Sequence, residues 1–306
     1  MHILITGATG YLGSALTQHL LNDGHEISIL RRPNSESKRL SSVLNKIATF
    51  DADTDKLKAP FCQSTPIDLI IHCATNYGRH SEGDGTILQT NVSFPLELLN
   101  LAIRKRVKAF INIDTVLPAL HNRYSLTKHQ FAQWAKLVAR QSEIKFVNIK
   151  MHNVYGPRDD KEKFSSWIIN ECINNTKVID LTDGTQERDF IYIYDVISAL
   201  RLIVNYYRES KGQWIEFIVG SGKPVSVREF AETVHRITSS QSVLNFGALK
   251  NRTDENVFEN YDIGPLLNLG WNPQVDLESG IRLSIGWGSN NFDNEKPGNI
   301  SFSQSG

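Results

Sequence analysis

An apolar strand runs directly into a glycine-rich turn at the start of this chain. Residues 2–6 (His-Ile-Leu-Ile-Thr) form the strand pattern, Gly7, Gly10 and Gly13 follow, and a helical pattern covers 14–22. Small residues at such a junction let the backbone approach a pyrophosphate, which the N-terminus of the next helix stabilises. The turn therefore predicts the dinucleotide-binding loop of a Rossmann-type fold, and a merely tight turn is the alternative.

Strand and helix patterns alternate through the first half of the chain. Apolar strand patterns and the helical patterns between them occupy 26–30, 67–72, 91–104, 110–113, 124–140 and 146–151. This alternation implies right-handed crossovers and a parallel sheet that is covered by helices on both faces. We expect an α/β protein with a Rossmann-type doubly wound parallel sheet and a smaller mixed α/β C-terminal substrate domain.

The alternation weakens after Gly156-Pro157, and this change suggests a domain boundary. We expect residues 1–155 to form the dinucleotide-binding domain, with 187–219 returning to it. The second domain is expected to combine 156–186 with 220–290. Residues 291–306 are polar and contain Gly, Ser and Asn, so a flexible tail is expected there.

Composition and charge exclude several classes of protein. The 306 residues carry a formal net charge of zero, which gives no electrostatic footprint for nucleic acid or a membrane surface. Cys62, Cys73 and Cys172 are too few and too scattered for a disulfide framework or a zinc site, so no metal site is expected. No apolar run approaches the roughly 18 residues of a membrane helix. The first strand leaves no room for a signal peptide, and a cytoplasmic protein is expected.

Tyr124 and Lys128 are four residues apart within the helical pattern at 124–140. This spacing places both side chains on one face of a helix, one turn apart. An ammonium beside a phenol favours the phenolate, so we expect Lys128 to lower the pKa of Tyr124 and make it a proton donor or acceptor near neutral pH. The alternative is a surface pair on an amphipathic helix.

The end of the second strand usually determines the choice of dinucleotide. An acid there binds a ribose 2′-hydroxyl, whereas an arginine accommodates a 2′-phosphate. Arg31 and Arg32 occupy this place, and no acid follows until Glu36. The pattern favours NADP(H) over NAD(H), unless both arginines are solvated loop residues. Asp51 lies where an acid could meet the adenine amine.

Seven segments form a combination that is typical of one known family. They are 6–13 (Thr-Gly-Ala-Thr-Gly-Tyr-Leu-Gly), 71–74, 91–92, Tyr124 with Lys128, 153–158 (Asn-Val-Tyr-Gly-Pro-Arg), 183–195 and 269–273. With them, the chain resembles an extended short-chain dehydrogenase/reductase of the NAD-dependent epimerase/dehydratase family, from Ile3 to about Trp287. The resemblance implies a nucleotide-diphosphate-sugar substrate and a homodimer that forms through the helices at 91–104 and 124–140.

Further segments narrow this resemblance. Tyr77-Gly78-Arg79-His80, the short interval from Thr115 to Tyr124, residues 163–167 and Gly220-Ser221-Gly222 resemble the CDP-paratose synthase type of enzyme. That type reduces the C4 ketone of a nucleotide-linked 4-keto-6-deoxy or 3,6-dideoxy hexose with NADPH. The implied role is deoxysugar biosynthesis for a surface polysaccharide such as the O-antigen of lipopolysaccharide.

The resemblance also assigns roles to residues. Thr115, Tyr124 and Lys128 are the expected catalytic set, with Asp114 and Ser125 as poor substitutes for Thr115. The expected cofactor-binding residues are Gly7, Thr9, Gly10, Tyr11, Leu12, Arg31, Arg32, Asp51, Ala52, Cys73, Ala74, Thr75, Asn91, Tyr124 and Lys128. The expected substrate-binding residues are Tyr77, Arg79, His80, Thr115, Asn153, Arg188 and Arg252. Asp189 and Asp195 are expected to organise structure.

Three other activities can be weighed against the same residues. A 4,6-dehydratase needs an acid–base pair right after the threonine, but Val116 and Leu117 follow Thr115. A 4-epimerase retains NAD, and Arg31 in place of an acid argues against it. A non-catalytic NADP-binding regulator needs no proton donor, so the catalytic set argues against that class. The sequence leaves the nucleotide base and the C4 stereochemistry open.

Overall fold

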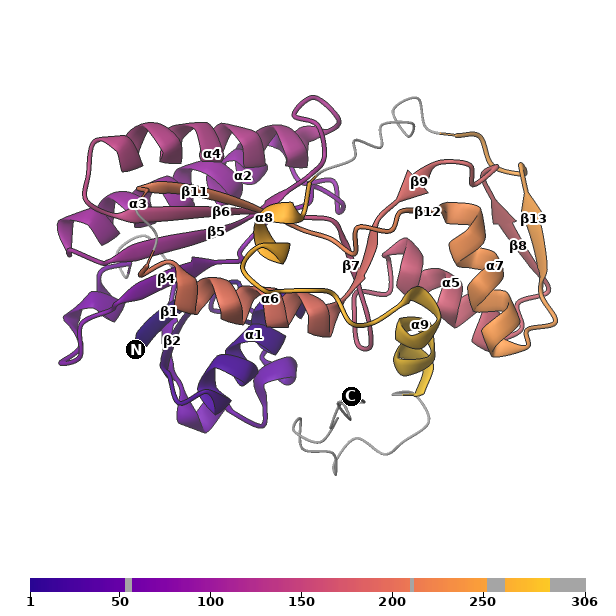
Figure 1. The fold of residues 1–306 in the computed structure, drawn as a ribbon, viewed down its shortest axis with the longest axis horizontal. Coiled ribbons are helices and arrows are strands. Elements are labelled where there is room, and N and C mark those ends of the chain that lie inside the picture. Colours follow the sequence, from indigo (N-terminus) through magenta and orange to yellow (C-terminus); the bar gives the residue numbers. More distant parts are fainter. Residues whose placement is uncertain (53–56, 210–211, 252–261, 287–306) are drawn as a thin grey trace.

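A computed structural model describes residues 1–52, 57–209, 212–251 and 262–286. Figure 1 shows a larger part built on one sheet, beside a smaller part formed by short strands and helices. The expected tail at 291–306 and Arg252 lie outside the described residues. No helix in the described ranges is long and apolar enough to cross a membrane.

The larger part contains a seven-stranded sheet whose neighbouring strands are all parallel. The strand order is β11-β6-β5-β4-β1-β2-β3. The strands are β1 (His2–Thr6), β2 (Glu26–Arg31), β3 (Ala48–Asp51), β4 (Leu69–His72), β5 (Ala109–Thr115), β6 (Lys145–Met151) and β11 (Trp214–Val219). The order reverses between β1 and β4, so a crevice is expected at the carboxyl ends of these strands. The predicted doubly wound fold is confirmed.

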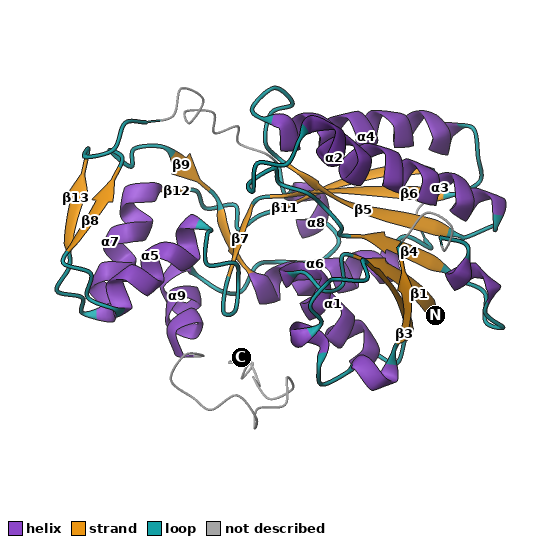
Figure 2. Cartoon of the chain, turned by 180° about the vertical axis from the view of Figure 1, so that it is seen from behind, coloured by secondary structure: helices purple, strands orange, loops and turns teal. Residues whose placement is uncertain are grey.

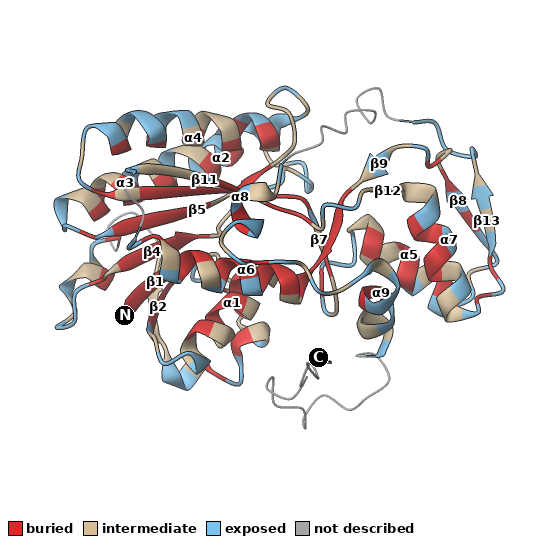
Figure 3. Ribbon diagram, in the orientation of Figure 1, coloured by how far each residue is buried: buried red, intermediate tan, exposed pale blue. Residues whose placement is uncertain are grey.

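Helices cover both faces of this sheet (Figures 1 and 2). One apolar core lies between the sheet and α1 (Tyr11–Asn22) with α6 (Ile193–Tyr206). A second core lies under α3 (Phe94–Arg104) and α4 (Arg123–Arg140). A short helix α2 (Asp84–Leu88) and a π-helical turn (Gln89–Ser93) precede α3. The strands β1, β2, β4, β5 and β6 are buried on both faces, which explains their nearly continuous apolar sequences (Figure 3).

The smaller part is a mixed α/β unit, as predicted. Its strand pairs are β7 (Asn153–Tyr155) with β10 (Phe190–Tyr192), β8 (Val178–Leu181) with β13 (Val243–Phe246), and β9 (Glu187–Arg188) with β12 (Val225–Ser226). The first two pairs are parallel and the third is antiparallel. Its helices are α5 (Phe164–Ile173), α7 (Val227–Thr238) and α9 (Leu277–Gly286).

Two segments from late in the chain return to the larger part. β11 is an edge strand of the seven-stranded sheet. The short helix α8 (Gly264–Leu267) contacts β11, although it falls within the 220–290 range expected for the second domain. A few residues after α8, the Trp271 indole Nε1 donates to the Ser198 hydroxyl on α6 at 2.8 Å. The C-terminal part of the chain therefore contacts both parts of the molecule.

Candidate active site

A cleft of about 2430 Å³ lies at the carboxyl ends of the sheet strands and extends to the smaller part. A pocket for one small ligand typically has a volume of roughly 300–1,000 Å³, so this cleft has room for two ligands. Its lining includes most of the predicted site residues: Gly7, Thr9, Gly10, Tyr11, Leu12, Arg31, Arg32, Ala52, Cys73, Ala74, Thr75, Tyr77, Arg79, Thr115, Tyr124, Lys128, Asn153 and Arg188. Asp51, His80 and Asn91 are not among the lining residues.

Gly7 and Gly13 of the glycine loop pack too closely against backbone atoms to carry a side chain. Gly7 has φ +69°, and a Cβ there would lie 2.5 Å from the Ala74 backbone nitrogen. A Cβ on Gly13 would lie 2.2 Å from the Gly7 carbonyl oxygen. Helix α1 begins at Tyr11 after Gly10, which provides no side-chain cap. Its N-terminal amides therefore suit a diphosphate, and this cradle fits a dinucleotide.

The basic edge of the cleft follows β2. Arg31 is partly buried, and its Nη1 donates to the Ser37 hydroxyl at 2.7 Å. Its Nε is buried without a hydrogen-bond partner. Sequence reasoning missed Ser35 and Arg39, which line the same edge, although they lie in the polar loop directly after Arg32. Several cationic groups at one edge favour an anion such as phosphate.

The residues after β4 are held by internal hydrogen bonds. The Asn91 side chain accepts from the Asn76 amide at 2.7 Å and from the Thr75 hydroxyl at 3.3 Å. Its amide nitrogen donates to the Asn76 carbonyl and to Thr127 on α4. All hydrogen-bonding capacity of this amide is thereby used. Any influence of Asn91 on a cofactor acts through the 75–76 loop and α4.

Cys73 and His72 end β4 in neutral forms. Burial raises the pKa of the Cys73 thiol to about 12, so the thiol is neutral and unreactive. His72 is fully buried, and its Nδ1 is 2.7 Å from the Thr6 hydroxyl on β1. Burial, assisted by the positive charge of Lys128, holds the pKa of His72 well below its ordinary value. His72 therefore joins β4 to β1 within the sheet, whereas Cys73 follows β4 and lines the cleft as a neutral thiol.

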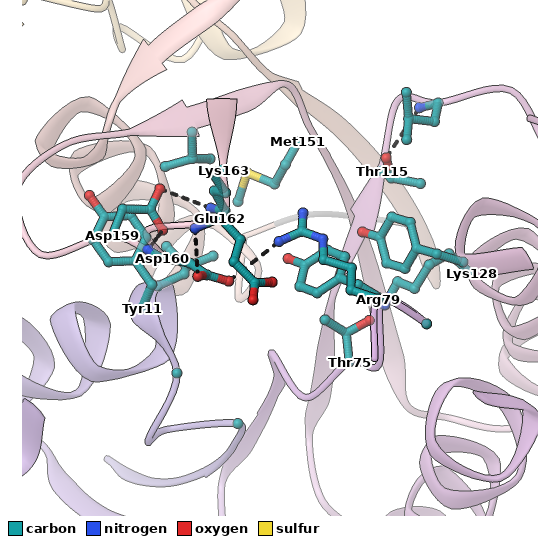
Figure 4. Close-up of a pocket in the computed structure, with 18 of the residues that line it drawn as sticks. Tyr11, Thr75, Arg79, Thr115, Lys128, Met151, Asp159, Asp160, Glu162 and Lys163 are labelled. Atoms are coloured by element: carbon teal, nitrogen blue, oxygen red, sulfur yellow. Dashed lines mark hydrogen bonds and ion pairs between the residues drawn. The ribbon is translucent and has the colours of Figure 1, made fainter. Parts of the chain in front are cut away.

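The structure brings Thr115, Tyr124 and Lys128 together in the cleft. Tyr124 and Lys128 lie in the first turns of α4, and Thr115 ends β5. The Thr115 hydroxyl oxygen accepts the Leu117 amide at 3.2 Å, and the Thr115 side chain lies close enough to Tyr124 to lower its pKa. Figure 4 shows Thr115 and Lys128 on the same side of the cleft. Ser125 instead forms a capping box with Asn122, which fixes the start of α4.

The pKa of Tyr124 is raised, which corrects the expectation that Lys128 lowers it. The ring is partly exposed, but protein surrounds its hydroxyl, and this desolvation is the largest effect. Tyr77 and the Asp114 carboxylate raise the pKa further, while the Thr115 hydrogen bond and Arg79 lower it. Burial lowers the pKa of Lys128, and Asp114 opposes that effect. Tyr124 is therefore a neutral phenol, the form that donates a proton.

Aromatic and cationic groups from the loop after β4 cover Tyr124. The Tyr77 ring lies 4.8 Å from the Tyr124 ring, and the Arg79 guanidinium lies 4.6 Å from the Tyr77 ring. Arg79 also contacts the Asp160 carboxylate at 3.3 Å. His80 instead donates its backbone amide to Glu82, outside the cleft lining. Tyr77 and Arg79 are thus placed to contact a substrate beside Tyr124.

The charged loop at 158–163 forms another part of the cleft lining, and the sequence analysis gave it no role in the site. Lys163 donates to the Asp159 carboxylate at 2.9 Å and lies 5.2 Å from the Tyr11 ring. Figure 4 shows this group beside Arg79, whose guanidinium contacts the Asp160 carboxylate of the same loop. The alternating acids and bases at 158–163 were a visible signal. The loop links the glycine turn to the smaller part of the molecule.

The remaining predicted residues lie where the two parts meet. Asn153 Nδ2 is 3.4 Å from the Asp189 carbonyl oxygen, and Arg188 donates to the Glu187 carbonyl. The Asp189 carboxylate accepts the backbone amides of Ser221 and Gly222, which confirms its structural role. Among the described residues, no cluster of His, Cys, Asp and Glu could hold a metal ion.

Comparisons with known proteins agree with this geometry. Residues 3–220 match the profile of the NAD dependent epimerase/dehydratase family. The chain is 31% identical over 291 residues to a CDP-abequose synthase from Salmonella muenchen, covering 92% of this chain and 96% of that protein. It is 32% identical to the CDP-abequose synthase of Salmonella typhimurium, with the same coverage.

Solved structures reproduce the fold at lower identity. UDP-glucose 4-epimerase from Thermotoga maritima, in complex with UDP-glucose, has a TM-score of 0.83 at 21% identity and covers 94% of this chain and 99% of its own. UDP-glucuronic acid 4-epimerase from Bacillus cereus, in complex with UDP-glucuronic acid and NAD, has a TM-score of 0.79 at 24% identity, with 94% and 98% covered. These two similarities concern the fold alone.

Proposed function

The chain belongs to the NAD dependent epimerase/dehydratase family, and we propose that it is an oxidoreductase that reduces the C4 ketone of a nucleotide-linked sugar with NADPH. The proposed substrate is a 4-keto-6-deoxy or 3,6-dideoxy hexose, as for an enzyme of the CDP-paratose or CDP-abequose synthase type. The observation that carries the proposal is the grouping of Thr115, Tyr124 and Lys128 in the lining of the cleft. Two relatives named CDP-abequose synthase support the substrate class.

The proposed mechanism separates the roles of the three residues. A nicotinamide dinucleotide, when bound, supplies the hydride for the C4 carbonyl carbon. Tyr124 donates its proton to the C4 oxygen as negative charge develops there. Thr115 donates a hydrogen bond to the same oxygen. Lys128, fully buried one turn from Tyr124, would hold the nicotinamide ribose.

The two ends of the cleft suit two ligands. We assign the adenine-ribose 2′-phosphate to the edge formed by Arg31, Arg32 and Arg39, and this assignment favours NADPH over NADH. We assign the sugar-nucleotide diphosphate to Arg188, with Asn153 beside it. The hexose then lies between Tyr77 and Thr115.

We also propose a homodimer that forms through α4. This helix exposes Trp134 and Leu137, whose side chains are 51% and 49% exposed. Exposed large apolar groups on one helix are typical of a protein contact. Sedimentation of the wild type against W134E tests this assembly, and an unchanged mass would contradict it.

The decisive experiment follows NADPH oxidation with CDP-, dTDP- and GDP-linked 4-keto-6-deoxy sugars, and identifies the product by NMR. A C4 alcohol formed at the expense of NADPH supports a reductase. Interconversion of C4 epimers without net NADPH consumption supports an epimerase. Tight NADP binding without turnover of any sugar supports a regulator.

The matched variant is Tyr124→Phe, which keeps the ring and removes the proton. We expect a loss of kcat of roughly 10²–10⁴-fold with unchanged NADPH affinity. Tyr77→Phe removes a hydroxyl from the neighbouring ring and serves as the control, with a much smaller loss. Equal losses in both variants would contradict the assignment of Tyr124.

A further inference from the structure

We propose that Asp160 is a positioning residue that holds Arg79, and through it the Tyr77 ring, at the sugar end of the cleft. The inference rests on the proposed reductase function and concerns the affinity of that site for the sugar. Asp160 follows β7 in the smaller part, whereas Arg79 belongs to the loop after β4 in the larger part. Both residues line the cleft, and the mechanism above gives Asp160 no role.

The turn that carries Asp160 is fixed by its own hydrogen bonds. The Asp159 side chain is fully buried, and its carboxylate accepts the Asp160 amide at 2.7 Å and the Lys163 ammonium at 2.9 Å. The Asp160 Oδ1 accepts the Glu162 amide at 3.1 Å, and the Lys163 amide donates to the Asp160 carbonyl oxygen. The Asp160 carboxylate therefore has a defined position, and its second oxygen is left for a partner outside the turn.

The same turn is attached to the dinucleotide end of the larger part. Arg39 Nη2 donates to the Arg158 carbonyl oxygen at 3.1 Å. The Lys163 ammonium lies 5.2 Å from the centre of the Tyr11 ring at the start of α1. Two contacts besides its own ion pair thus set the place of Asp160 relative to the sheet, so its carboxylate can position a neighbouring side chain.

The partner of the second carboxylate oxygen is Arg79 (Figure 4). Arg79 Nη1 lies 3.3 Å from Asp160 Oδ2, and the guanidinium carbon lies 4.6 Å from the centre of the Tyr77 ring. The Tyr77 ring in turn lies 4.8 Å from the Tyr124 ring, at an interplanar angle of 39°. A continuous series of contacts therefore leads from Asp160 to the ring of the proposed proton donor.

Burial does not hold Tyr77 and Arg79 in place. Tyr77 is 44% exposed, and the Arg79 side chain is 36% exposed. A long, partly exposed side chain has many rotamers, and confining it costs conformational entropy. The ion pair with Asp160 offsets part of this cost before the substrate binds, so Tyr77 and Arg79 are already ordered when they meet the hexose.

The first test is Asp160→Asn, which keeps Oδ1 for the Glu162 amide and replaces Oδ2 by an NH₂ group that cannot accept from Arg79. Partly exposed ion pairs contribute little, so we expect KM for the nucleotide sugar to rise by about two- to fivefold. Because the pair orders the binding site and does not touch the reacting atoms, kcat should stay within roughly twofold of the wild-type value. NADPH affinity should not change.

Three further variants separate positioning from a general effect of charge. Glu162→Gln removes the same charge from the same turn, and Glu162 has no ion pair with any residue that the structure describes, so its KM should stay near the wild-type value. Asp160→Glu keeps a carboxylate for the partly exposed Arg79 and should restore most of the affinity. In an Arg79→Ala background, D160N should add nothing, because its effect passes through Arg79. A further loss in that background, or an equal loss in E162Q, would overturn the proposal.

Equilibrium binding gives a readout that does not depend on turnover. Calorimetry in the NADP⁺ complex compares CDP-, dTDP- and GDP-linked glucose with the free nucleoside diphosphates. D160N should weaken binding of the nucleotide sugars by about two- to fivefold and leave the free diphosphates unchanged, because only the hexose reaches Tyr77.

The two readouts together separate this proposal from the proposed function. Weaker binding of the nucleotide sugars alone in D160N, without turnover of any keto sugar, would support Asp160 and reject the reductase. Ketone reduction with no change of KM or binding in D160N would support the reductase and reject Asp160. A wild-type protein that binds none of the nucleotide sugars and reduces no keto sugar would overturn both.

Discussion

At the residue scale, Arg31 has a guanidinium that is fixed in position and still has a donor without a protein acceptor. The Ser37 hydroxyl accepts a hydrogen bond from Nη1 of Arg31, while the buried Nε has no protein acceptor. An arginine fixed in this way loses little side-chain freedom when it binds phosphate. The choice of cofactor should therefore depend on this one side chain more than on the exposed Arg32.

The corresponding prediction concerns Arg31→Ala. Loss of charged hydrogen bonds worth about 1.5–3 kcal/mol should weaken NADPH binding by roughly 10–150-fold. NADH lacks the 2′-phosphate, so its affinity should change much less. Fluorescence titration of both cofactors measures the difference, with the exposed Arg140→Ala as a control. Equal weakening of NADPH and NADH would show that Arg31 does not contact the 2′-phosphate.

The Tyr124–Lys128 pair shows what residue spacing can and cannot predict. A four-residue interval in a helical pattern correctly predicted a shared position in the cleft. It gave the wrong direction for the pKa of Tyr124, because burial of the hydroxyl raises this pKa and Tyr77 and Asp114 raise it further. These residues come from other strands and loops, so the local pattern around Tyr124 does not include them.

At the scale of single elements, the start of α4 positions both catalytic side chains. Asn122 accepts the Ser125 amide at 2.8 Å, and Ser125 Oγ accepts the Asn122 amide at 3.0 Å. Because Tyr124 and Lys128 follow in the first turns, fraying of this end would displace them. The capping box therefore stabilises the helix and the site together.

We predict that Asn122→Ala lowers the unfolding free energy by about 1 kcal/mol and also lowers kcat. Asp276→Ala is the matched control, because Asp276 accepts the Ser279 amide in the same way at the start of α9. That variant should cost similar stability with kcat retained. Urea denaturation and steady-state kinetics provide both values. An unchanged kcat in N122A would show that the first turn holds its geometry without the cap.

The pair of His72 and Thr6 joins β4 to β1 in the centre of the sheet. His72 is neutral when folded because its pKa is well below the ordinary value of 6.5. As pH falls below about 6.5, the unfolded chain binds this proton and the folded protein does not, so stability is lost. Above that pH this contribution is constant.

We predict that His72→Gln has a smaller loss of stability between pH 7.5 and 5.5 than the wild type. The partly buried His19 and His25 should leave some of this pH dependence in the variant, because burial lowers their pKa values too. Denaturant titrations at both pH values measure the loss of unfolding free energy, with the exposed His80→Gln as a control. A slope equal to that of the wild type would show that His72 is protonated in the folded state.

Long, periodic elements were predictable, and short or edge elements were not. The strands β1, β2, β4, β5 and β6 are buried, so their apolar runs indicated them. Strand β11 is only partly buried and carries Glu216, so its sequence did not identify it. β7, β9 and β12 contain two or three residues each, which is too short for any period to show. Their pairing is set by partners far away in the sequence.

At the scale of the whole molecule, the two parts are connected by carboxylates that hold backbone amides. Asp189 binds the 221–222 loop, and Asp195 on α6 accepts the amides of Gln274 and Val275 at 2.9 and 3.0 Å. Sequence reasoning correctly expected both to be structural. It could not identify their partners, because these contacts join residues far apart in the sequence.

Asp195→Asn tests this connection. An amide has one acceptor oxygen, so one of the two backbone donors should lose its partner and face an NH₂ group. We expect the free energy of unfolding to fall by about 1–3 kcal/mol, with kcat retained because Asp195 does not line the cleft. Asp23→Asn is the control. Asp23 forms a partly exposed ion pair with Arg201, which lies on α6 as Asp195 does. Such a pair is typically worth about 0–1 kcal/mol, so D23N should cost less. Equal stability losses in the two variants, measured by urea denaturation, would show that the 272–275 segment is held by its apolar contacts rather than by Asp195.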